Sequence, residues 1–239
     1  MFYQFYSKPS VASQKETAEK RKKALIKKKI EINPVEAITG NKTAKTWWGV
    51  AWNTNLETYA DYQNRIDRGK SYCKNGLVID LNITEGLIQA KVSGSDLYDI
   101  LIKIDSLPES KWKKICSKCA QRVDSIAALV DGKFPKELSE VFMNQKEGLF
   151  PSPREIHMRC SCPDMAGLCK HLAAVLYGVG ARLDSDPLLF FKLRSINPSE
   201  LIKKSVDEKM KNLLANANKK SKRVIADKDI ARLFDIETI

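Results

Sequence analysis

Residues 77–104 read LVIDLNITEGLIQAKVSGSDLYDILIKI, and three stretches within this segment alternate between apolar and polar residues. A period of two places alternate side chains on one face of a β-strand, so each stretch predicts a strand with one buried face. Glu85 and Gly86 fit a short hairpin turn between the first two strands. The segment therefore predicts an antiparallel meander. Its predicted buried faces are Leu77, Ile79, Leu81 and Ile83, then Ile88, Ala90 and Val92, then Tyr98, Ile100, Ile102 and Ile104.

Helices are predicted on both sides of this meander. Upstream, Trp47, Trp48 and Trp52 precede further apolar residues at roughly helical spacing. Large aromatic residues on a helical stripe favour a buried anchor over an exposed surface that stacks on bases. Downstream, the expected helices run from Pro108 to Gly132, from Pro135 to Met143, from Asp186 as N-cap with Pro187 in the first turn, and from Pro198 onward.

The stretch CSCPDMAGLCKH, residues 160–171, places three of the six cysteines and one of the two histidines within twelve positions. Alternation in the preceding residues predicts a strand that delivers Cys160 and Cys162 to one side, followed by a turn at Pro163 and Gly167. A mostly apolar helix follows. Residues two apart on a regular helix face nearly opposite ways, so Cys169 and His171 can share one ion only if Cys169 is still in the turn.

Three thiolates and one imidazole match the closed tetrahedral coordination of structural zinc, so Cys160, Cys162, Cys169 and His171 are predicted to bind Zn²⁺. The alternatives are unmetallated core thiols and a cysteine nucleophile with His157 as its base. Cys116 and Cys119 form a second C-x-x-C, but no further Cys or His stands nearby in sequence to complete four ligands. They are predicted to be core residues, as is Cys73.

The net charge of +12 is concentrated at the two ends of the chain. Residues 1–45 hold 11 basic and 4 acidic groups, and residues 201–239 hold 10 and 6, whereas residues 46–150 hold 14 of each. Clustered cations favour phosphate binding, although a merely solubilising lysine-rich segment is an equal alternative. The candidate nucleic-acid contacts are Lys20, Arg21, Lys22 and Lys23 in a solvated helix or mobile arm, and Arg65, Arg68, Lys70 and Lys74 before the first strand.

The pattern C-x-C-x₆-C-x-H at residues 160–171 resembles the SWIM zinc finger family, and the segments TWWGVAWNTNLE, RGKSYCKNGLVIDL and DPLLFFKLR look like those around the finger in stand-alone prokaryotic members. The resemblance implies a zinc-binding module for DNA or for proteins. It also implies an association with SWI/SNF-type helicases. The lysine-rich N-terminal arm lies outside the family pattern, so the resemblance implies no function for it.

The expected fold class is α+β: an antiparallel β-meander with packed helices, then a small strand–turn–helix zinc finger and C-terminal helices. We expect four segments: a basic arm (1–45), an α+β domain (46–150), the finger (151–195) and a C-terminal helical segment (196–239).

The expected function is binding of nucleic acid, with DNA the favoured ligand, as an accessory factor of a helicase or repair assembly. The alternative is a protein-interaction adaptor in which the zinc finger is purely structural. No carboxylate or histidine constellation predicts an enzyme. The N-terminus lacks the pattern of a signal peptide and no stretch has the length of a membrane span, so a cytoplasmic protein without membrane contact is expected.

Overall fold

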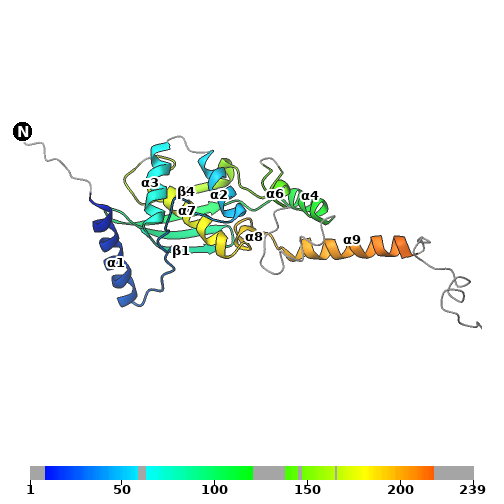
Figure 1. The fold of residues 1–239 in the computed structure, drawn as a ribbon, viewed down its shortest axis with the longest axis horizontal. Coiled ribbons are helices and arrows are strands. Elements are labelled where there is room, and N and C mark those ends of the chain that lie inside the picture. The colour runs from blue at the N-terminus through cyan, green and yellow to red at the C-terminus, as the bar shows by residue number, and fades with distance from the viewer. Residues whose placement is uncertain (1–8, 59–62, 121–137, 145–146, 165, 218–239) are drawn as a thin grey trace, which may run out of the picture.

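The computed structural model describes residues 9–58, 63–120, 138–144, 147–164 and 166–217, and within them the fold is α+β, as predicted (Figure 1). Its centre is a sheet of four antiparallel strands in the order β1-β2-β3-β4. The strands are β1 (Val78–Thr84), β2 (Leu87–Ser93), β3 (Leu97–Ile104) and β4 (Ile156–Cys160). The predicted meander supplies the first three, and Gly86, at φ 62°, closes the first hairpin, as predicted.

The fourth strand comes from the predicted finger segment, more than fifty positions after β3. Ile104 pairs with Ile156 and Ile100 pairs with Cys160, so β4 lies antiparallel beside β3. The hydrogen bond from Ser161 N to Asp99 O continues this pairing past the end of the strand. One continuous sheet therefore joins the predicted segments 46–150 and 151–195.

A β-bulge in β1 corrects the prediction for its buried face. Val78 pairs with Val92 but Asp80 pairs with Lys91, so Ile79 is an extra residue in the ladder. Such an insertion shifts the alternation of side chains by one position. As a result, Leu77 and Ile79 pack in a small separate cluster, whereas Val78 and Leu81 face the main core. The prediction that Leu77, Ile79, Leu81 and Ile83 share one face was wrong for this reason.

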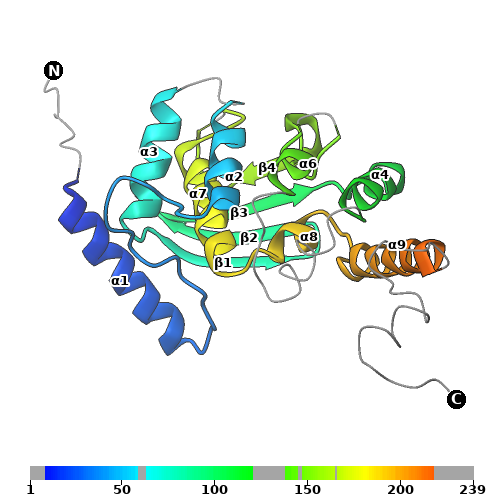
Figure 2. The same ribbon diagram turned by 45° about the vertical axis from the view of Figure 1, so that its right-hand side comes forward.

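One face of the sheet is covered by α2 (Trp47–Glu57), α3 (Gln63–Lys74) and α7 (Lys170–Ser185) (Figure 2). α7 is the central helix and contacts all four strands as well as α2 and α3. Trp52 is fully buried and its indole N–H donates to Leu176 O at 2.9 Å, which confirms the predicted anchor for this residue, whereas Trp47 and Trp48 are half-buried. Gly69 permits the close packing of α3 on α7, because a Cβ there would lie 2.4 Å from the Cβ of Ala173.

The basic N-terminal segment forms α1 (Val11–Lys27), which packs against the end of the sheet. Ala18 is buried with Leu77 and Ile79, and Leu25 packs against this cluster. The bulge in β1 directs Leu77 and Ile79 of this cluster toward α1. The chain then runs beside β1, where Val35 N donates to Val78 O and Leu81 N donates to Asn33 O. The helical alternative for the arm is thus confirmed for these residues.

Beyond the central sheet lie α4 (Glu109–Ala120), α6 (Ser139–Phe142), α8 (Leu189–Leu193) and α9 (Ser199–Ala217). α9 packs against α4 and then extends away from the sheet (Figure 1). The N-cap of α8 is Leu188, so the prediction of Asp186 as N-cap was wrong; Asp186 ends α7 and its carboxylate accepts from Leu188 N. The predicted continuation of a helix to Gly132, the residues from Pro135 to 137, and residues 218–239 lie outside the described ranges.

Within the described ranges, every helix is too short or too polar to cross a membrane.

Candidate metal centre

Two of the candidate ligands lie at the end of β4. The short helix η2 (Pro153–Glu155) leads directly into β4. Cys160 is the last residue of this strand, and Cys162 lies in the bend that follows it. The strand thus delivers one thiol, and the prediction that it delivers both was wrong. The bend places the thiol of Cys162, because it turns the chain back toward the sulfur of Cys160.

The other two ligands lie at the start of α7. Cys169 is the N-cap, with extended backbone angles of φ −82° and ψ 166°, and its sulfur accepts from Leu172 N at 3.5 Å. His171 lies in the first helical turn and is 3% exposed. The prediction that Cys169 belongs to the turn and not to the helix is confirmed.

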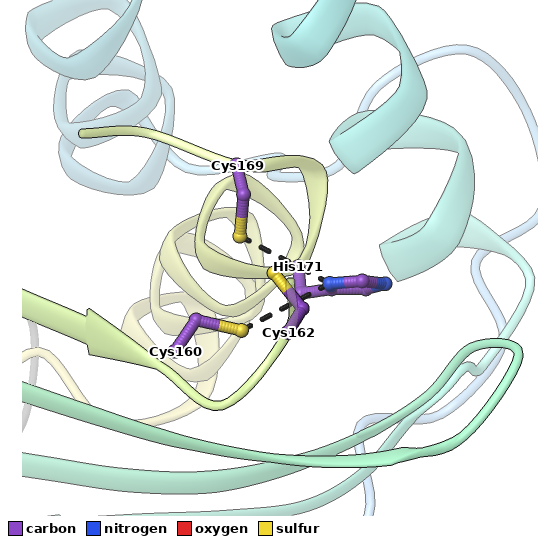
Figure 3. Close-up of side chains that lie close together, drawn as sticks. All are labelled: Cys160, Cys162, Cys169 and His171. Atoms are coloured by element: carbon purple, nitrogen blue, oxygen red, sulfur yellow. Dashed lines mark hydrogen bonds between the residues drawn. The ribbon is translucent and has the colours of Figure 1, made fainter. Parts of the chain in front are cut away.

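The four side chains converge on one space between β4 and α7 (Figure 3). Their three sulfurs and one ring nitrogen all lie within 4.8 Å of one another. His171 Nδ1 is 3.9 Å from the sulfur of Cys160 and 3.9 Å from that of Cys169. In a tetrahedral zinc site, bonds of about 2.3 Å to sulfur and about 2.0 Å to nitrogen place neighbouring ligand atoms about 3.6 to 3.8 Å apart. A small inward movement would therefore complete a four-coordinate site.

Burial favours the uncharged forms of three of these ligands, Cys160, Cys169 and His171, until a metal binds. Burial lowers the pKa of His171, the nearby charges of Lys170 and Arg68 act in the same direction, and together they bring it to about 4. The imidazole is therefore neutral at pH 7, the form that binds a metal. Burial also raises the pKa of the Cys160 and Cys169 thiols. Metal binding must therefore release the thiol protons. In this buried group, thiolates are far more favourable when bound to a cation than when left without one.

Two tyrosines enclose the imidazole. The Tyr98 ring lies 4.3 Å from the His171 ring, at an interplanar angle of 34°, and the Tyr72 ring lies 5.6 Å away at 65°. Gly94 closes a third side, because a Cβ there would lie 2.8 Å from His171 Nε2. Among the described residues Nε2 is buried without a hydrogen-bond partner. The ring is thus oriented by packing, with Nδ1 directed at the sulfurs.

Basic side chains border the centre on the side of α3. Lys170 stands between two ligands in sequence, and its ammonium lies 5.5 Å from the centroid of the Tyr72 ring. Burial lowers the pKa of Lys170, and the charge of Arg68 lowers it further. Arg65 forms an ion pair with Asp164 in the turn of the finger. Arg65 and Arg68 were predicted as contacts from the sequence, whereas Lys170 was not; its position between the two ligands of C-K-H was the available signal.

Lys70 and Lys74 lie on the other flank of α3. They line a polar depression of about 490 Å³ together with Lys15 of α1 and Asp67. Lys70 also lies 5.9 Å from the centroid of the Tyr177 ring. The depression brings the basic arm and the α3 cluster, which are distant in sequence, to one place on the surface.

The four candidate contacts in the arm differ from one another. Lys20 pairs with Glu16 at 2.6 Å and Lys22 pairs with Glu19 at 2.7 Å, while Lys23 is exposed. Arg21 instead binds the β2–β3 turn, with hydrogen bonds to Ser93 Oγ and to the carbonyls of Gly94, Ser95 and Asp96. Arg21 therefore faces the sheet, whereas Lys20 and Lys23 face solvent and the side chain of Lys22 is only 15% exposed.

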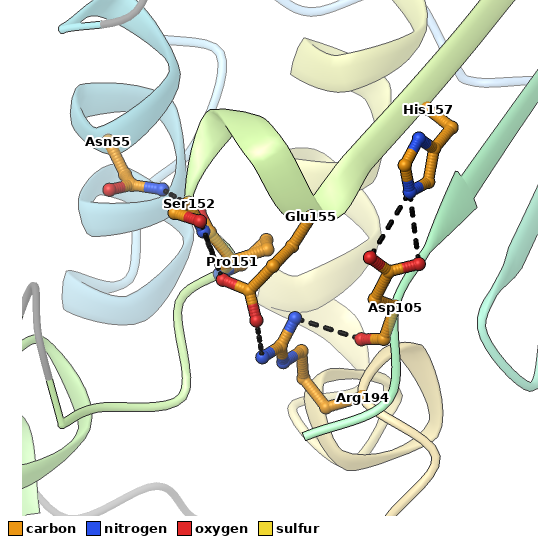
Figure 4. A network of polar contacts seen from close by, with 7 residues as sticks. All are labelled: Asn55, Asp105, Pro151, Ser152, Glu155, His157 and Arg194. Atoms are coloured by element: carbon orange, nitrogen blue, oxygen red, sulfur yellow. Dashed lines mark hydrogen bonds and ion pairs between the residues drawn. The ribbon is translucent and has the colours of Figure 1, made fainter. Parts of the chain in front are cut away.

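A buried ion pair fixes the start of the finger to the segment after it (Figure 4). Arg194 is 1% exposed and donates to Glu155 Oε1 at 2.6 Å and to Asp105 O at 2.9 Å. Glu155 also accepts from the N–H and the hydroxyl of Ser152 at 2.8 Å each. His157, the second histidine, binds Asp105 at 3.0 Å and is not among the side chains that converge on the metal centre.

The remaining cysteines are core residues, as predicted. Cys73, Cys116 and Cys119 are each at most 1% exposed. Burial raises the pKa of Cys73 to about 12 and that of Cys116 to about 11. Among the described residues, one group of ligands suitable for a metal is found, and it excludes all three.

Residues 152–179 match the family model of the SWIM zinc finger. The chain is also 35% identical over 167 residues to the uncharacterized protein Rv2102 of Mycobacterium tuberculosis (strain ATCC 25618 / H37Rv). The matched region covers 69% of this chain and 60% of that relative. No solved structure matches the chain significantly.

Proposed function

We propose, from the match of residues 152–179 to the SWIM zinc finger, that the bound ion is Zn²⁺ and that the finger organises a nucleic-acid-binding surface, with DNA as its ligand. Zn²⁺ would be held by Cys160, Cys162, Cys169 and His171 and would supply a fixed link between β4 and α7. Four protein ligands leave no position for an activated water. This donor set therefore supports binding rather than catalysis.

The observation that supports nucleic-acid binding best is the placement of Arg68 and Lys170 beside the finger. The two residues come from α3 and α7, which pack together, and the Lys170 ammonium lies 5.5 Å from the centroid of the Tyr72 ring on α3. Two cations on neighbouring helices offer a phosphate group charge-assisted hydrogen bonds between α3 and the start of α7.

The depression lined by Lys15, Lys70 and Lys74 offers a second basic surface on the other flank of α3, next to α1. A duplex carries one phosphate per about 1.7 Å of its axis, so several phosphates could meet such a surface at once. Binding would then depend on the geometry of the backbone and on salt, with sequence preference a separate question.

The direct test is a fluorescence-anisotropy titration of the full chain with a labelled 20-base-pair duplex at several salt concentrations. Replacing Arg68 and Lys170 together by Gln should weaken binding and lower the salt slope by about two. Lys192→Gln is a matched control, because Lys192 is an exposed lysine on α8, beyond the far end of α7. Affinity that does not change with salt, or that falls equally in the control, would refute the proposal.

The second candidate is a protein-interaction adaptor, and α9 is the feature that favours it. Val206, Met210, Leu213 and Leu214 are 51% to 68% exposed, and their spacing places them along one face of the helix. Exposed apolar rows of this kind often mark protein contacts. The resemblance to stand-alone SWIM proteins makes a SWI/SNF-type helicase the partner to test first.

A pull-down of the full chain with and without nuclease separates the two candidates. A complex that is lost on nuclease treatment supports the nucleic-acid tether. A complex that survives, and that Met210→Glu together with Leu213→Glu abolishes while DNA binding is kept, supports the adaptor.

A further inference from the structure

Arg21 of the basic arm faces the sheet, and its contacts lead directly to the metal centre. Its guanidinium donates to Ser93 Oγ at 2.9 Å, Gly94 O at 3.0 Å, Ser95 O at 2.9 Å and Asp96 O at 2.9 Å. These acceptors form the complete turn between β2 and β3. Only a rigid, forked donor can serve four acceptors in one turn, so lysine cannot replace arginine here.

The turn that Arg21 holds is the wall of the pocket around His171. Gly94 approaches Nε2 so closely that an added Cβ would lie 2.8 Å from it. Ser95 Oγ is 2.7 Å from the hydroxyl of Tyr98, whose ring stacks on the imidazole at 4.3 Å. Since Nε2 has no hydrogen-bond partner within the described part of the chain, the turn takes the place of the polar partner that usually orients a metal-binding histidine.

We propose that Arg21 is a positioning residue for the metal centre: by fixing the β2–β3 turn, it orients His171 for coordination and couples the docking of α1 to retention of the ion. Ala18 and Leu25 supply the apolar part of the same docking surface, next to Leu97 at the end of the turn. The inference concerns metal binding alone and stands whether or not the protein binds nucleic acid. It removes Arg21 from the set of phosphate contacts and leaves the exposed Lys20 and Lys23 of α1 in it.

The test measures the release of Zn²⁺ from the full-length protein to an excess of a coloured chelator, together with the absorption spectrum of the Co²⁺-substituted protein. Loss of an outer partner of a metal ligand typically weakens metal binding 10- to 100-fold, so Arg21→Gln should release zinc at least about tenfold faster. It should also shift the Co²⁺ d–d bands, because those bands report the ligand geometry.

Two controls separate positioning from general stability. Lys23→Gln removes an exposed charge from the same helix and should leave both readouts unchanged. Arg182→Gln removes a comparable clamp, since Arg182 donates to the carbonyls of Asn33 and Pro34, but it lies about three turns from His171 along α7. It should lower the melting temperature without shifting the Co²⁺ bands.

Two further variants probe the same turn from other directions. Arg21→Lys keeps the charge but loses the fork and should behave like Arg21→Gln in the Co²⁺ spectrum. Gly94→Ala leaves Arg21 in place but intrudes on His171, and should shift the bands as well. Wild-type zinc release and an unchanged spectrum in Arg21→Gln would overturn the proposal, and so would an equal spectral shift in Arg182→Gln.

Discussion

Cys169 Sγ and His171 Nδ1 lie 3.9 Å apart although the two residues are separated by one position at the start of a helix. On a regular helix, positions i and i+2 are turned by about 200° from each other. The extended backbone of Cys169 removes this obstacle, because the residue is the N-cap and lies outside the helical path. The same residue accepts a hydrogen bond from Leu172 N, so it serves both as cap and as ligand.

Cys169→Ser should separate these two roles. Serine is a good N-cap but a poor ligand for zinc beside two thiolates, so the variant should keep the start of α7 and lose the ion. Cys169→Ala should lose both. We expect less than one zinc per chain in both variants, and a metal-free Ser form that is about 1 kcal/mol more stable than the Ala form in urea unfolding.

Metal analysis and urea titrations of the two variants, each treated with chelator beforehand, provide the comparison. Full retention of zinc by Cys169→Ser would contradict the assignment of Cys169 as a ligand. Equal stabilities of the metal-free forms would show instead that a side-chain cap at this position contributes nothing.

Removal of the metal from the wild-type protein should loosen β4 before the rest of the sheet. β4 is an edge strand that pairs only with β3 among the described strands, and two ligands lie at or just after its end. Without the ion, the link from this strand to α7 is lost. Amide hydrogen exchange should rise by at least about tenfold in residues 156–162, while the β1–β2 hairpin keeps its protection. Uniform exchange along the chain would show that the metal stabilises the whole fold equally.

The metal ligands could be predicted from sequence because they are local. All four lie within twelve residues, and their types and spacing define the coordination without knowledge of the rest of the fold. The period of two in residues 77–104 is equally local, and three of the four strands followed from it. The bulge at Ile79 was missed because an inserted residue changes the register without changing the composition of the strand.

The contacts that the sequence did not reveal join distant segments. β4 joins β3 across a gap of more than fifty residues, and Arg21 binds a turn more than seventy positions later. A basic run gives no indication that one of its members faces inward, since that depends on which side of α1 meets the sheet. Arg65 is similar, because its partner Asp164 lies in the turn of the finger.

Cys116 and Cys119 should be replaceable without loss of metal. Both are buried in the main core, at 1% and 0% exposure, and are predicted to act as small apolar side chains. The double variant Cys116→Ala, Cys119→Ala should keep one zinc per chain and lose about 2 kcal/mol or more of unfolding free energy through lost packing. Metal analysis and urea unfolding measure the two quantities. A halved zinc content would reveal a second site that uses these thiols.

Glu155 should make the stability of the protein depend on pH in the acid range. Burial raises the pKa of Glu155, but hydrogen bonds from Arg194 and Ser152 and the charge of Arg194 lower it more, so that it falls from 4.5 to about 2. A carboxyl group whose pKa is lower in the folded state contributes stability that is fully present above its unfolded pKa and is lost as the pH falls through the folded pKa. The contribution should therefore disappear between about pH 5 and pH 2.

Glu155→Gln tests this window, because it removes the titrating group while keeping its size. Above pH 5 the variant should be less stable by about 3 kcal/mol, since Arg194 is left buried without a charged partner. As the pH falls toward 2, the wild-type protein loses the same interaction and the difference between the two proteins should shrink. Guanidinium unfolding of both proteins across this range measures the difference directly, and the titration of other groups cancels in it. A difference that stays constant from pH 7 to pH 2 would mean that the pair with Arg194 does not hold the carboxyl group in its charged form.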